Sequence, residues 1–270
     1  MYSQGKHTEA EELIRETLVI FQRVSGKEHL DTLTSMGNLG FVLCNSGKYL
    51  EAEKIHRDGL KLKLKVLGRE HPSALRCMSR LGLALRDQGL TRQGSLSEAE
   101  DLHRDALSLM GKVLGREHPA MLDCMNSLVM TLDDQDKHEE AEQLSRRALE
   151  LHEKVLGKEH NDTLFTVTIL ARVLDGQSRY EESLAFYERA YTGYEANLGP
   201  NHPNTEKYRY CHSSILFVVD EDCLRKKSPE ITNAVSGSTP SDPQGWNTAN
   251  PALRSKDWWW RDWRNWKTNK

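Results

Sequence analysis

The sequence lacks any long apolar run. Its densest stretch, residues 215–219, is far shorter than the roughly 18 residues that a membrane-spanning helix needs. The N-terminus also lacks the apolar core of a secretory signal peptide. The five cysteines show no CxxC spacing and make an odd number, which favours reduced thiols over a disulfide framework. We therefore expect a cytoplasmic protein.

Neither sign of charge is in large excess. The chain has 37 Lys and Arg against 40 Asp and Glu, a formal net charge of -3. Nucleic-acid-binding proteins usually carry a clear basic excess, so no nucleic-acid partner is expected. Tryptophan is missing from most of the chain, because all six tryptophans lie between Trp246 and Trp266. The apolar share of 37% is low for one round globule but enough for thin layers of packed helices.

One short motif recurs along the chain at a nearly constant interval. Gly-Lys/Arg-Glu-His stands at residues 26–29, 68–71, 115–118 and 157–160, with a degraded copy at 199–202. Successive glycines are 42, 47, 42 and 42 residues apart, and Glu-Ala-Glu recurs in step, beginning at residues 9, 51, 98 and 140. Five extra residues within 90–97 account for the longer interval, since a helical array tolerates an insertion in a surface turn.

Each period predicts two helices. Apolar residues three and four positions apart form one stripe in the first, the A helix, and again in the second, the B helix, which begins at Glu-Ala-Glu. A glycine follows each B helix, where a left-handed residue is expected to end it. His-Pro at 71–72 and 118–119 is expected to open the next A helix. Small residues, Gly40 and Gly82 on A helices and Ala52 and Ala99 on B helices, predict closely approaching pairs.

These residues resemble the tetratricopeptide repeat. Leu39-Gly40, Leu43 and Ala52 follow its large and small positions, and the long period with its Leu-Gly-Arg-Glu-His-Pro turn is similar to the kinesin light chain type. That type also occurs C-terminal to the nucleotide-binding domain of fungal NB-ARC (STAND) receptor-like proteins. The resemblance implies an all-α fold, a right-handed superhelical solenoid of antiparallel helix pairs over residues 1–224. The first repeat would be truncated and the last degenerate.

Two features of those relatives are missing from this sequence. It has no heptad coiled coil, and no Gly-Lys pair lies in a GxxxxGK[ST] phosphate-binding loop. We interpret the chain as an array without its usual N-terminal partner domain. Either the gene product is truncated, or it works as a bare array.

The resemblance also implies a function. It predicts a monomeric, non-catalytic scaffold that binds a peptide or partner domain in a concave groove lined by A helices. The expected groove residues are Thr34, Phe41, Arg76, Ser79, Arg86, Asp123, Asn126, Asp133, Thr168 and Arg172. Arg76 and Arg86 would clamp an acidic side chain, because a planar guanidinium pairs a carboxylate through two hydrogen bonds. The alternative is that all of these are ordinary solvated helix residues.

No catalytic, cofactor or metal site is predicted. The sequence has no HExxH and no nucleophile elbow. Equivalent histidines of neighbouring repeats stand two helices apart, and helices pack about 8–10 Å from axis to axis, whereas zinc ligands lie within about 2.3 Å of the metal. His29, His71, His118 and His160 are therefore expected to share one local role in each turn. Cys77 and Cys124 occupy the same repeat position, which indicates packing.

Residues 225–270 are predicted to be a disordered, Trp-rich basic tail. They contain nine Lys and Arg against four Asp and Glu. Trp258-Trp259-Trp260 beside Arg261 and Arg264 suits an anionic membrane surface or stacking on single-stranded nucleic acid. The tail can equally be an unselected extension without function. Two alternative functions thus stay open, a fragment of a STAND-type receptor regulator and a module anchored to membrane through this tail.

Overall fold

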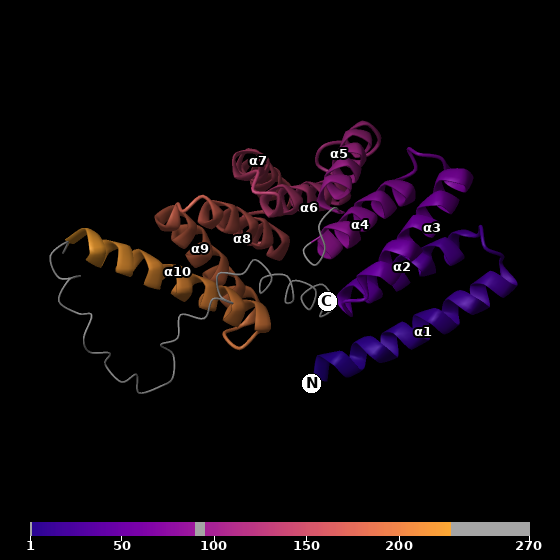
Figure 1. The fold of residues 1–270 in the computed structure, drawn as a ribbon, viewed down its shortest axis with the longest axis horizontal. Coiled ribbons are helices and arrows are strands. Elements are labelled where there is room, and N and C mark those ends of the chain that lie inside the picture. The colour runs from indigo at the N-terminus through magenta and orange to yellow at the C-terminus, as the bar shows by residue number, and fades with distance from the viewer. Residues whose placement is uncertain (1, 90–94, 228–270) are drawn as a thin grey trace. The chain divides into compact units, whose positions relative to one another are not determined.

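The computed structural model describes residues 2–89 and 95–227, which form helices joined by short turns (Figure 1). The predicted tail beyond Lys227 and residues 90–94 of the insertion lie outside the described residues. The helices are α1 (Tyr2–Val24), α2 (Leu30–Asn45), α3 (Tyr49–Leu67), α4 (Pro72–Gly89), α5 (Ser95–Val113), α6 (Pro119–Asp134), α7 (His138–Leu156), α8 (Asn161–Gly176), α9 (Tyr180–Leu198) and α10 (Pro203–Lys227). None of these helices is long and apolar enough to cross a bilayer.

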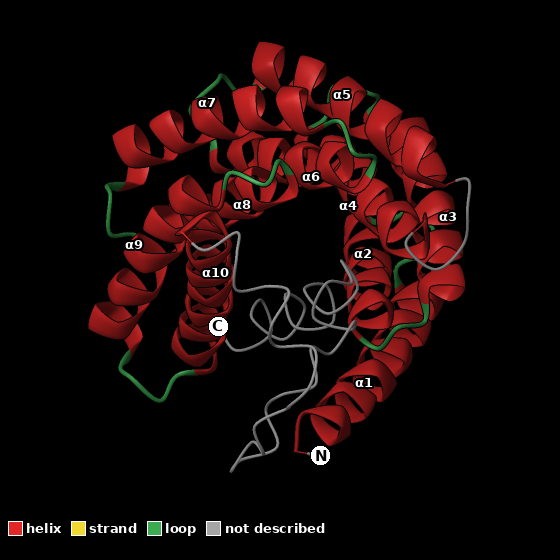
Figure 2. Cartoon of the chain, turned by 60° about the vertical axis from the view of Figure 1, so that its left-hand side comes forward, coloured by secondary structure: helices red, strands yellow, loops and turns green. Residues whose placement is uncertain are grey.

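The predicted order of helices is confirmed. The B helices are α1, α3, α5, α7 and α9, and the A helices are α2, α4, α6, α8 and α10. The chain divides into two compact units, one ending at Leu151 and one beginning at His152. In the first unit α2 contacts α4 and α4 contacts α6, so these A helices form one layer, while α3 and α5 lie on its other side (Figure 2). In the second unit α9 packs against both α8 and α10.

The turn glycine ends each B helix through its backbone. Gly68 has φ 82° and ψ 168°, and Gly199 has φ 89° and ψ 164°. This is an extended conformation with positive φ, and not the left-handed helical one that the sequence suggested. A Cβ at either glycine would meet nothing within 4 Å. The residue is therefore required by its φ angle, which side-chain-bearing residues rarely adopt, rather than by lack of space.

The turn histidines all cap the following A helix, which confirms that they share one local role. In each, Nδ1 accepts a hydrogen bond of 3.1–3.3 Å from the backbone N–H two residues later; the five are His29, His71, His118, His160 and His202. The bond satisfies one of the backbone donors that the first turn of a helix leaves unpaired. Proline then occupies the first helical position of α4, α6 and α10, as expected where no N–H is needed.

Each helix pair is fitted together where the A helix crosses the B helix. A Cβ on Gly40 would lie 2.5 Å from the His56 ring, and one on Gly82 would lie 2.6 Å from the His103 ring. In the next repeat the same two positions hold Val129 and Ser145, both fully buried. A large residue on one helix thus accompanies a small residue on the other. Close packing requires this, because a protein core has no spare volume.

Cys77 and Cys124 also belong to this crossing. The thiol of Cys77 points to the carbonyl of His56 at 3.6 Å, and that of Cys124 points to the carbonyl of His103 at 3.7 Å. Burial raises the pKa of Cys124 to about 12, so the group is a neutral thiol near pH 7. Their equivalent roles confirm that these cysteines serve packing.

The Glu-Ala-Glu motif builds a ladder of ion pairs on the B helices of the first unit. Its alanine is fully buried at Ala52 and Ala99. Each arginine of the ladder bonds the glutamate one turn before it and, at 2.6–2.7 Å, the first glutamate of the next motif; the links are Arg15 to Glu51, Arg57 to Glu98 and Arg104 to Glu140.

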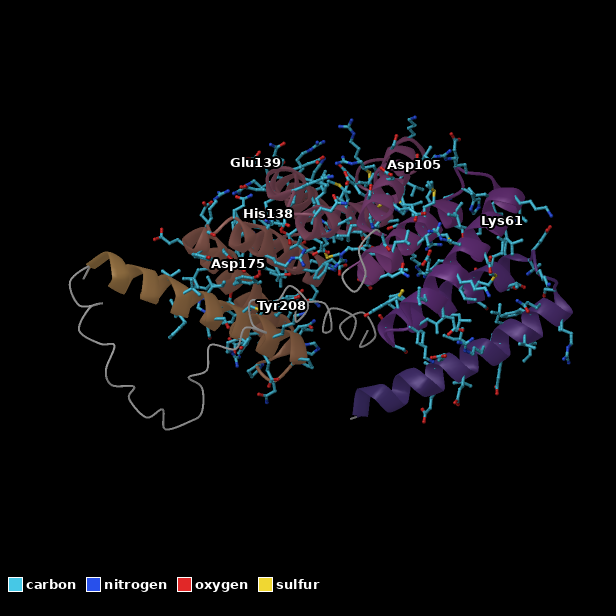
Figure 3. The ribbon with its side chains drawn as sticks, in the orientation of Figure 1. Lys61, Asp105, His138, Glu139, Asp175 and Tyr208 are labelled. Atoms are coloured by element: carbon cyan, nitrogen blue, oxygen red, sulfur yellow. The ribbon has the colours of Figure 1, made fainter. Side chains whose placement is uncertain are left out.

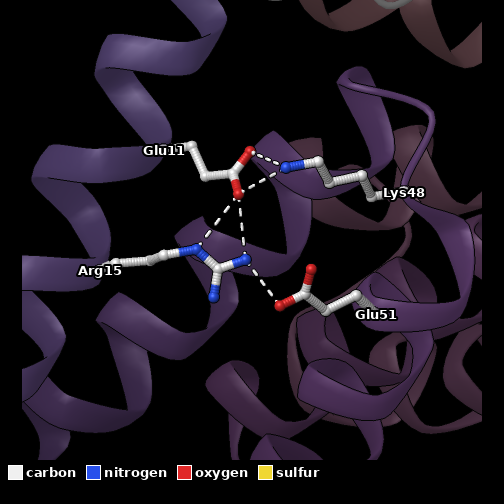
Figure 4. Close-up of polar contacts among 4 residues, drawn as sticks. All are labelled: Glu11, Arg15, Lys48 and Glu51. Atoms are coloured by element: carbon white, nitrogen blue, oxygen red, sulfur yellow. Dashed lines mark hydrogen bonds and ion pairs between the residues drawn. The ribbon is translucent and has the colours of Figure 1, made fainter.

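Figure 4 shows the first link of this ladder, where Lys48 also bonds Glu11 at 2.8 Å. That hydrogen bond is the main reason that the pKa of Glu11 lies below its ordinary value. Exposed pairs contribute little to stability one by one, so the importance of the ladder is that it gives Arg15, Arg57 and Arg104 carboxylate partners.

The packing at the crossing predicts that a second substitution can restore the stability lost through a first one. Gly82→Val should destabilise the protein by about 1–3 kcal/mol, because the new side chain meets the His103 ring. Gly82→Val combined with His103→Ser recreates the Val129–Ser145 pair and should be more stable than the sum of the two single changes predicts. Urea denaturation of the four proteins measures this coupling.

Gly111→Ala is the matched control, since its Cβ would meet nothing closer than 3.7 Å and it should not destabilise. A coupling energy of zero in the double-mutant cycle would show that the two positions do not share one volume.

The buried histidines predict acid sensitivity. Burial, assisted by nearby Arg80 and Lys63, lowers the pKa of His56 to about 3, and burial, assisted by Arg86, lowers that of His103 to about 3. Unfolding returns each imidazole to a pKa of about 6.5, so the unfolded state gains protons as the pH falls from 6.5 toward 3 and stability is lost over that window. Between pH 7 and pH 5 each histidine should cost about 2 kcal/mol.

His103→Gln removes one of these groups. The free energy of unfolding of this variant, measured in urea at both pH values, should fall less than that of wild type between pH 7 and pH 5. An equal fall in both proteins would mean that His103 takes up its proton in the folded state.

Candidate interaction site on the A helices

The structure divides the predicted groove residues into three groups by exposure. Thr34, Arg76 and Asp123 are exposed, and Phe41 and Ser79 are half-buried. The buried ones are Arg86, Asn126, Asp133, Thr168 and Arg172. The exposed and half-buried members all lie on α2, α4 and α6 of the first unit. We call the solvent-facing side of these three helices the A face.

Arg86 belongs to the interior rather than to the A face. Its side chain is 0% exposed, and its Nε donates to Asp134 Oδ2 at 2.6 Å. Asp134 is equally buried, so this ion pair joins the ends of α4 and α6. A clamp on a bound acidic side chain needs an accessible guanidinium. In this structure Arg76 meets that requirement and Arg86 does not.

Two of the other four buried members, Asp133 and Thr168, are held by hydrogen bonds within their own unit. Asp133 accepts a hydrogen bond of 2.9 Å from His138, labelled in Figure 3. Thr168 on α8 donates its hydroxyl to the carbonyl of Phe165 at 2.7 Å. Asn126 is 3% exposed and lies deep in α6. That these residues contact a ligand stays a prediction. Because they are buried, ligand binding on the A face would depend on the exposed and half-buried residues.

Two cations that the sequence analysis did not select meet at the junction of α2, α3 and α4. Gly37 on α2 has no side chain, and a Cβ there would lie 3.3 Å from Arg80 Nη1 and 3.8 Å from Lys63 Nζ. The Arg80 guanidinium stacks over the Phe41 ring, 5.8 Å from its centroid, a distance at which a cation is attracted by the ring. Arg76 lies one helical turn before Arg80 on α4.

These three cations repel one another, and Lys63 and Arg80 are also poorly solvated. Burial lowers the pKa of Lys63, and Arg80 and Arg76 lower it further. Burial and Arg76 likewise lower the pKa of Arg80. Among the described residues, no carboxylate forms a hydrogen bond or ion pair with Lys63, Arg76 or Arg80; Asp123 acts on Arg80 only at longer range. A junction of this kind favours an anion that enters from solvent.

The sequence itself contains a signal that Lys63 is unusual. The residues at the same repeat position in the later B helices are Met110, His152 and Tyr194, all buried. A lysine in that series places a charge where the repeat requires a core side chain. Arg80 gives a similar signal, because its counterpart in the next A helix is the small residue Ser127.

The chemistry of this site is recognition by charge and shape. The nearby Cys77 is a neutral thiol, because burial raises its pKa. Within residues 2–89 and 95–227, no group of three or more His, Cys, Asp or Glu side chains is placed to hold a metal ion. What the junction offers to a ligand is therefore the positive charge of its three cations and the flat Phe41 ring.

Comparison with known proteins agrees with the observed fold. The tetratricopeptide repeat family matches residues 1–61, 35–93, 90–154 and 128–196. A crystal structure of a kinesin light chain-type protein with nearly identical TPR-like repeats from Podosopora anserina is 24% identical; the match covers 72% of this chain and 90% of that one, with a TM-score of 0.59. BtubC (BKLC) from P. vanneervenii is 15% identical, with 91% and 95% covered and a TM-score of 0.61.

No curated protein matches the chain. The two solved structures share its fold, with helices packed in sequence as in kinesin light chain-like arrays. The family match, in contrast, extends over well more than half of the sequence and coincides with the helix pairs described above. The chain therefore belongs to the tetratricopeptide repeat family.

Proposed function

We propose that the chain is a non-catalytic scaffold that binds a peptide segment of a protein partner on its A face. Arrays of this family are typically protein-interaction modules. The A face of the first unit offers Thr34, Phe41, Arg76, Ser79 and Asp123 to such a segment. The ligand would lie across α2, α4 and α6 and meet a different set of side chains on each helix.

One observation carries this proposal: the arginines of the ladder have carboxylate partners, and the accessible arginines of the A face have none among the described residues. On the B helices of the first unit, Arg15, Arg57 and Arg104 each bind two glutamates. On the A face, Arg76 and Arg80 have no carboxylate partner among the described residues. Arg76 and Arg80 thus remain available for a carboxylate from a ligand, whereas the three ladder arginines already have theirs.

The unpaired cations also indicate the kind of segment. A carboxylate that approaches Arg76 from solvent can form two parallel hydrogen bonds with its guanidinium. The half-buried Phe41 ring offers apolar contact beside it. We therefore expect a segment with an acidic side chain next to an apolar one. Specificity would come from the few exposed residues, since the repeat positions themselves are committed to packing.

Charge reversal at Arg76 tests the assignment. Peptides selected from a random display library against the wild-type chain should bind Arg76→Glu at least about tenfold more weakly, because a charge-assisted hydrogen bond contributes about 1.5–3 kcal/mol. Lys61→Glu is the control, since Lys61 is an exposed cation of α3 (Figure 3) and carries the same charge change. Isothermal titration of one selected peptide compares the three proteins.

Equal binding to wild type and Arg76→Glu would remove the A face from the proposal. A library that yields no binding peptide at all would contradict the scaffold function itself.

A further inference from the structure

Lys63 departs from the pattern of the repeat, because a charged side chain occupies a buried position. It is 6% exposed, and no carboxylate pairs with it among the described residues. An isolated buried ammonium is costly, and proteins normally pair such a group or replace it. The same repeat position holds Met110 in the next B helix, which shows that the fold accepts an apolar residue there. The packing of the repeat therefore does not require the charge.

The cationic ends of Arg80 and Lys63 converge beside Gly37, which has no side chain. A side chain at Gly37 would come within 3.3 Å of Arg80 Nη1 and 3.8 Å of Lys63 Nζ, so both cationic ends lie beside the same missing group. The other A helices have Ser79, Asn126, Thr168 and Tyr210 at this position. Of α2, α4, α6, α8 and α10, only α2 has a glycine at this position, and there the two cationic ends lie close to its backbone.

The charge at this junction exceeds what a single carboxylate neutralises. Lys63, Arg76 and Arg80 bring three positive charges, and the one carboxylate that acts on Arg80 is Asp123. His56 next to them is uncharged near pH 7, because burial, with Arg80 and Lys63, lowers its pKa to about 3. An excess of two positive charges remains, and a phosphate monoester carries about -1.5 to -2 at that pH.

We propose that the junction of Lys63, Arg80 and Gly37 binds the phosphate of a phosphoserine or phosphothreonine in the segment held on the A face. The inference rests on the proposed function and names the group that the segment brings. Arg80 presents a planar guanidinium, held over Phe41, that can bind two phosphate oxygens. Lys63 supplies a point charge from α3, and exposed Arg76 attracts the anion from solvent.

The position of the site favours a peptide over a membrane surface. Lys63 lies below the helix surface, whereas binding to a bilayer requires basic side chains that project from the protein. A single phosphorylated side chain on an extended segment can enter where a flat surface cannot.

Three matched peptide libraries test the inference. Each has random flanking residues and a fixed central residue, which is phosphoserine, serine or glutamate. The wild-type chain should retain the phosphoserine library about tenfold more strongly than the other two in a fluorescence binding assay. Addition of inorganic phosphate at the same concentration should not displace it, because the flanking residues contribute to binding.

Lys63→Met is the decisive variant, since Met110 shows that this residue suits the position. It should reduce the preference for phosphoserine below about twofold while its midpoint of urea denaturation stays unchanged or rises, because an unpaired buried charge is removed. Lys61→Met is the control, because it removes the same charge from an exposed position of the same helix. The control should keep the full preference.

The outcomes separate the two proposals. If all three libraries bind equally, the A face still binds peptides and the phosphate site is wrong. If no library binds, both proposals fail. A Lys63→Met variant that keeps the preference, or free phosphate that competes as well as the phosphopeptide, would also overturn the assignment of this junction to a phosphorylated side chain.

Discussion

In each repeat the A helix and the B helix pack closely where they cross, and the volume available to side chains at this crossing is fixed. Gly40 admits the His56 ring and Gly82 admits the His103 ring, and the next repeat reverses the sizes with Val129 and Ser145. The thiols of Cys77 and Cys124 lie on the carbonyls of the same histidines. Because each repeat buries its residues against its neighbours, a change at one crossing has to be compensated on the facing helix and not elsewhere in a central core.

The requirement for close packing also identifies the candidate site, because the site departs from it. Along the B helices, one position faces the adjacent A helices and holds Lys63, Met110, His152 and Tyr194 in turn. Three of these residues satisfy this requirement as core side chains, and Lys63 does not. The charged ladder of Arg15, Arg57 and Arg104 makes the contrast stronger, since that layer leaves none of the three unpaired. The departures from the repeat therefore gather at the junction of α2, α3 and α4.

The repeat itself was predictable from the sequence because its signals are local. The spacing of apolar residues, the turn glycines and His-Pro each depend on a few adjacent residues, and the observed helix bounds follow them. The site was less predictable, because exposure depends on the neighbouring helices. Arg76 and Arg86 look alike in the sequence, yet Arg86 is buried and paired with Asp134 of α6, whereas Arg76 is exposed. Lys63 was missed because its helix was assigned to the layer away from the expected groove.

The central claim is that Lys63 is a buried ammonium with no acidic partner among the described residues, and that it binds an anionic ligand. The direct measurement is an NMR titration of its side chain, with Lys61 as the exposed reference in the same helix. The pKa of Lys63 should lie below the ordinary lysine value in the free protein, as its burial and cationic neighbours require, and should rise when a phosphoserine peptide binds. A pKa of Lys63 equal to that of Lys61, unchanged by the peptide, would contradict the account.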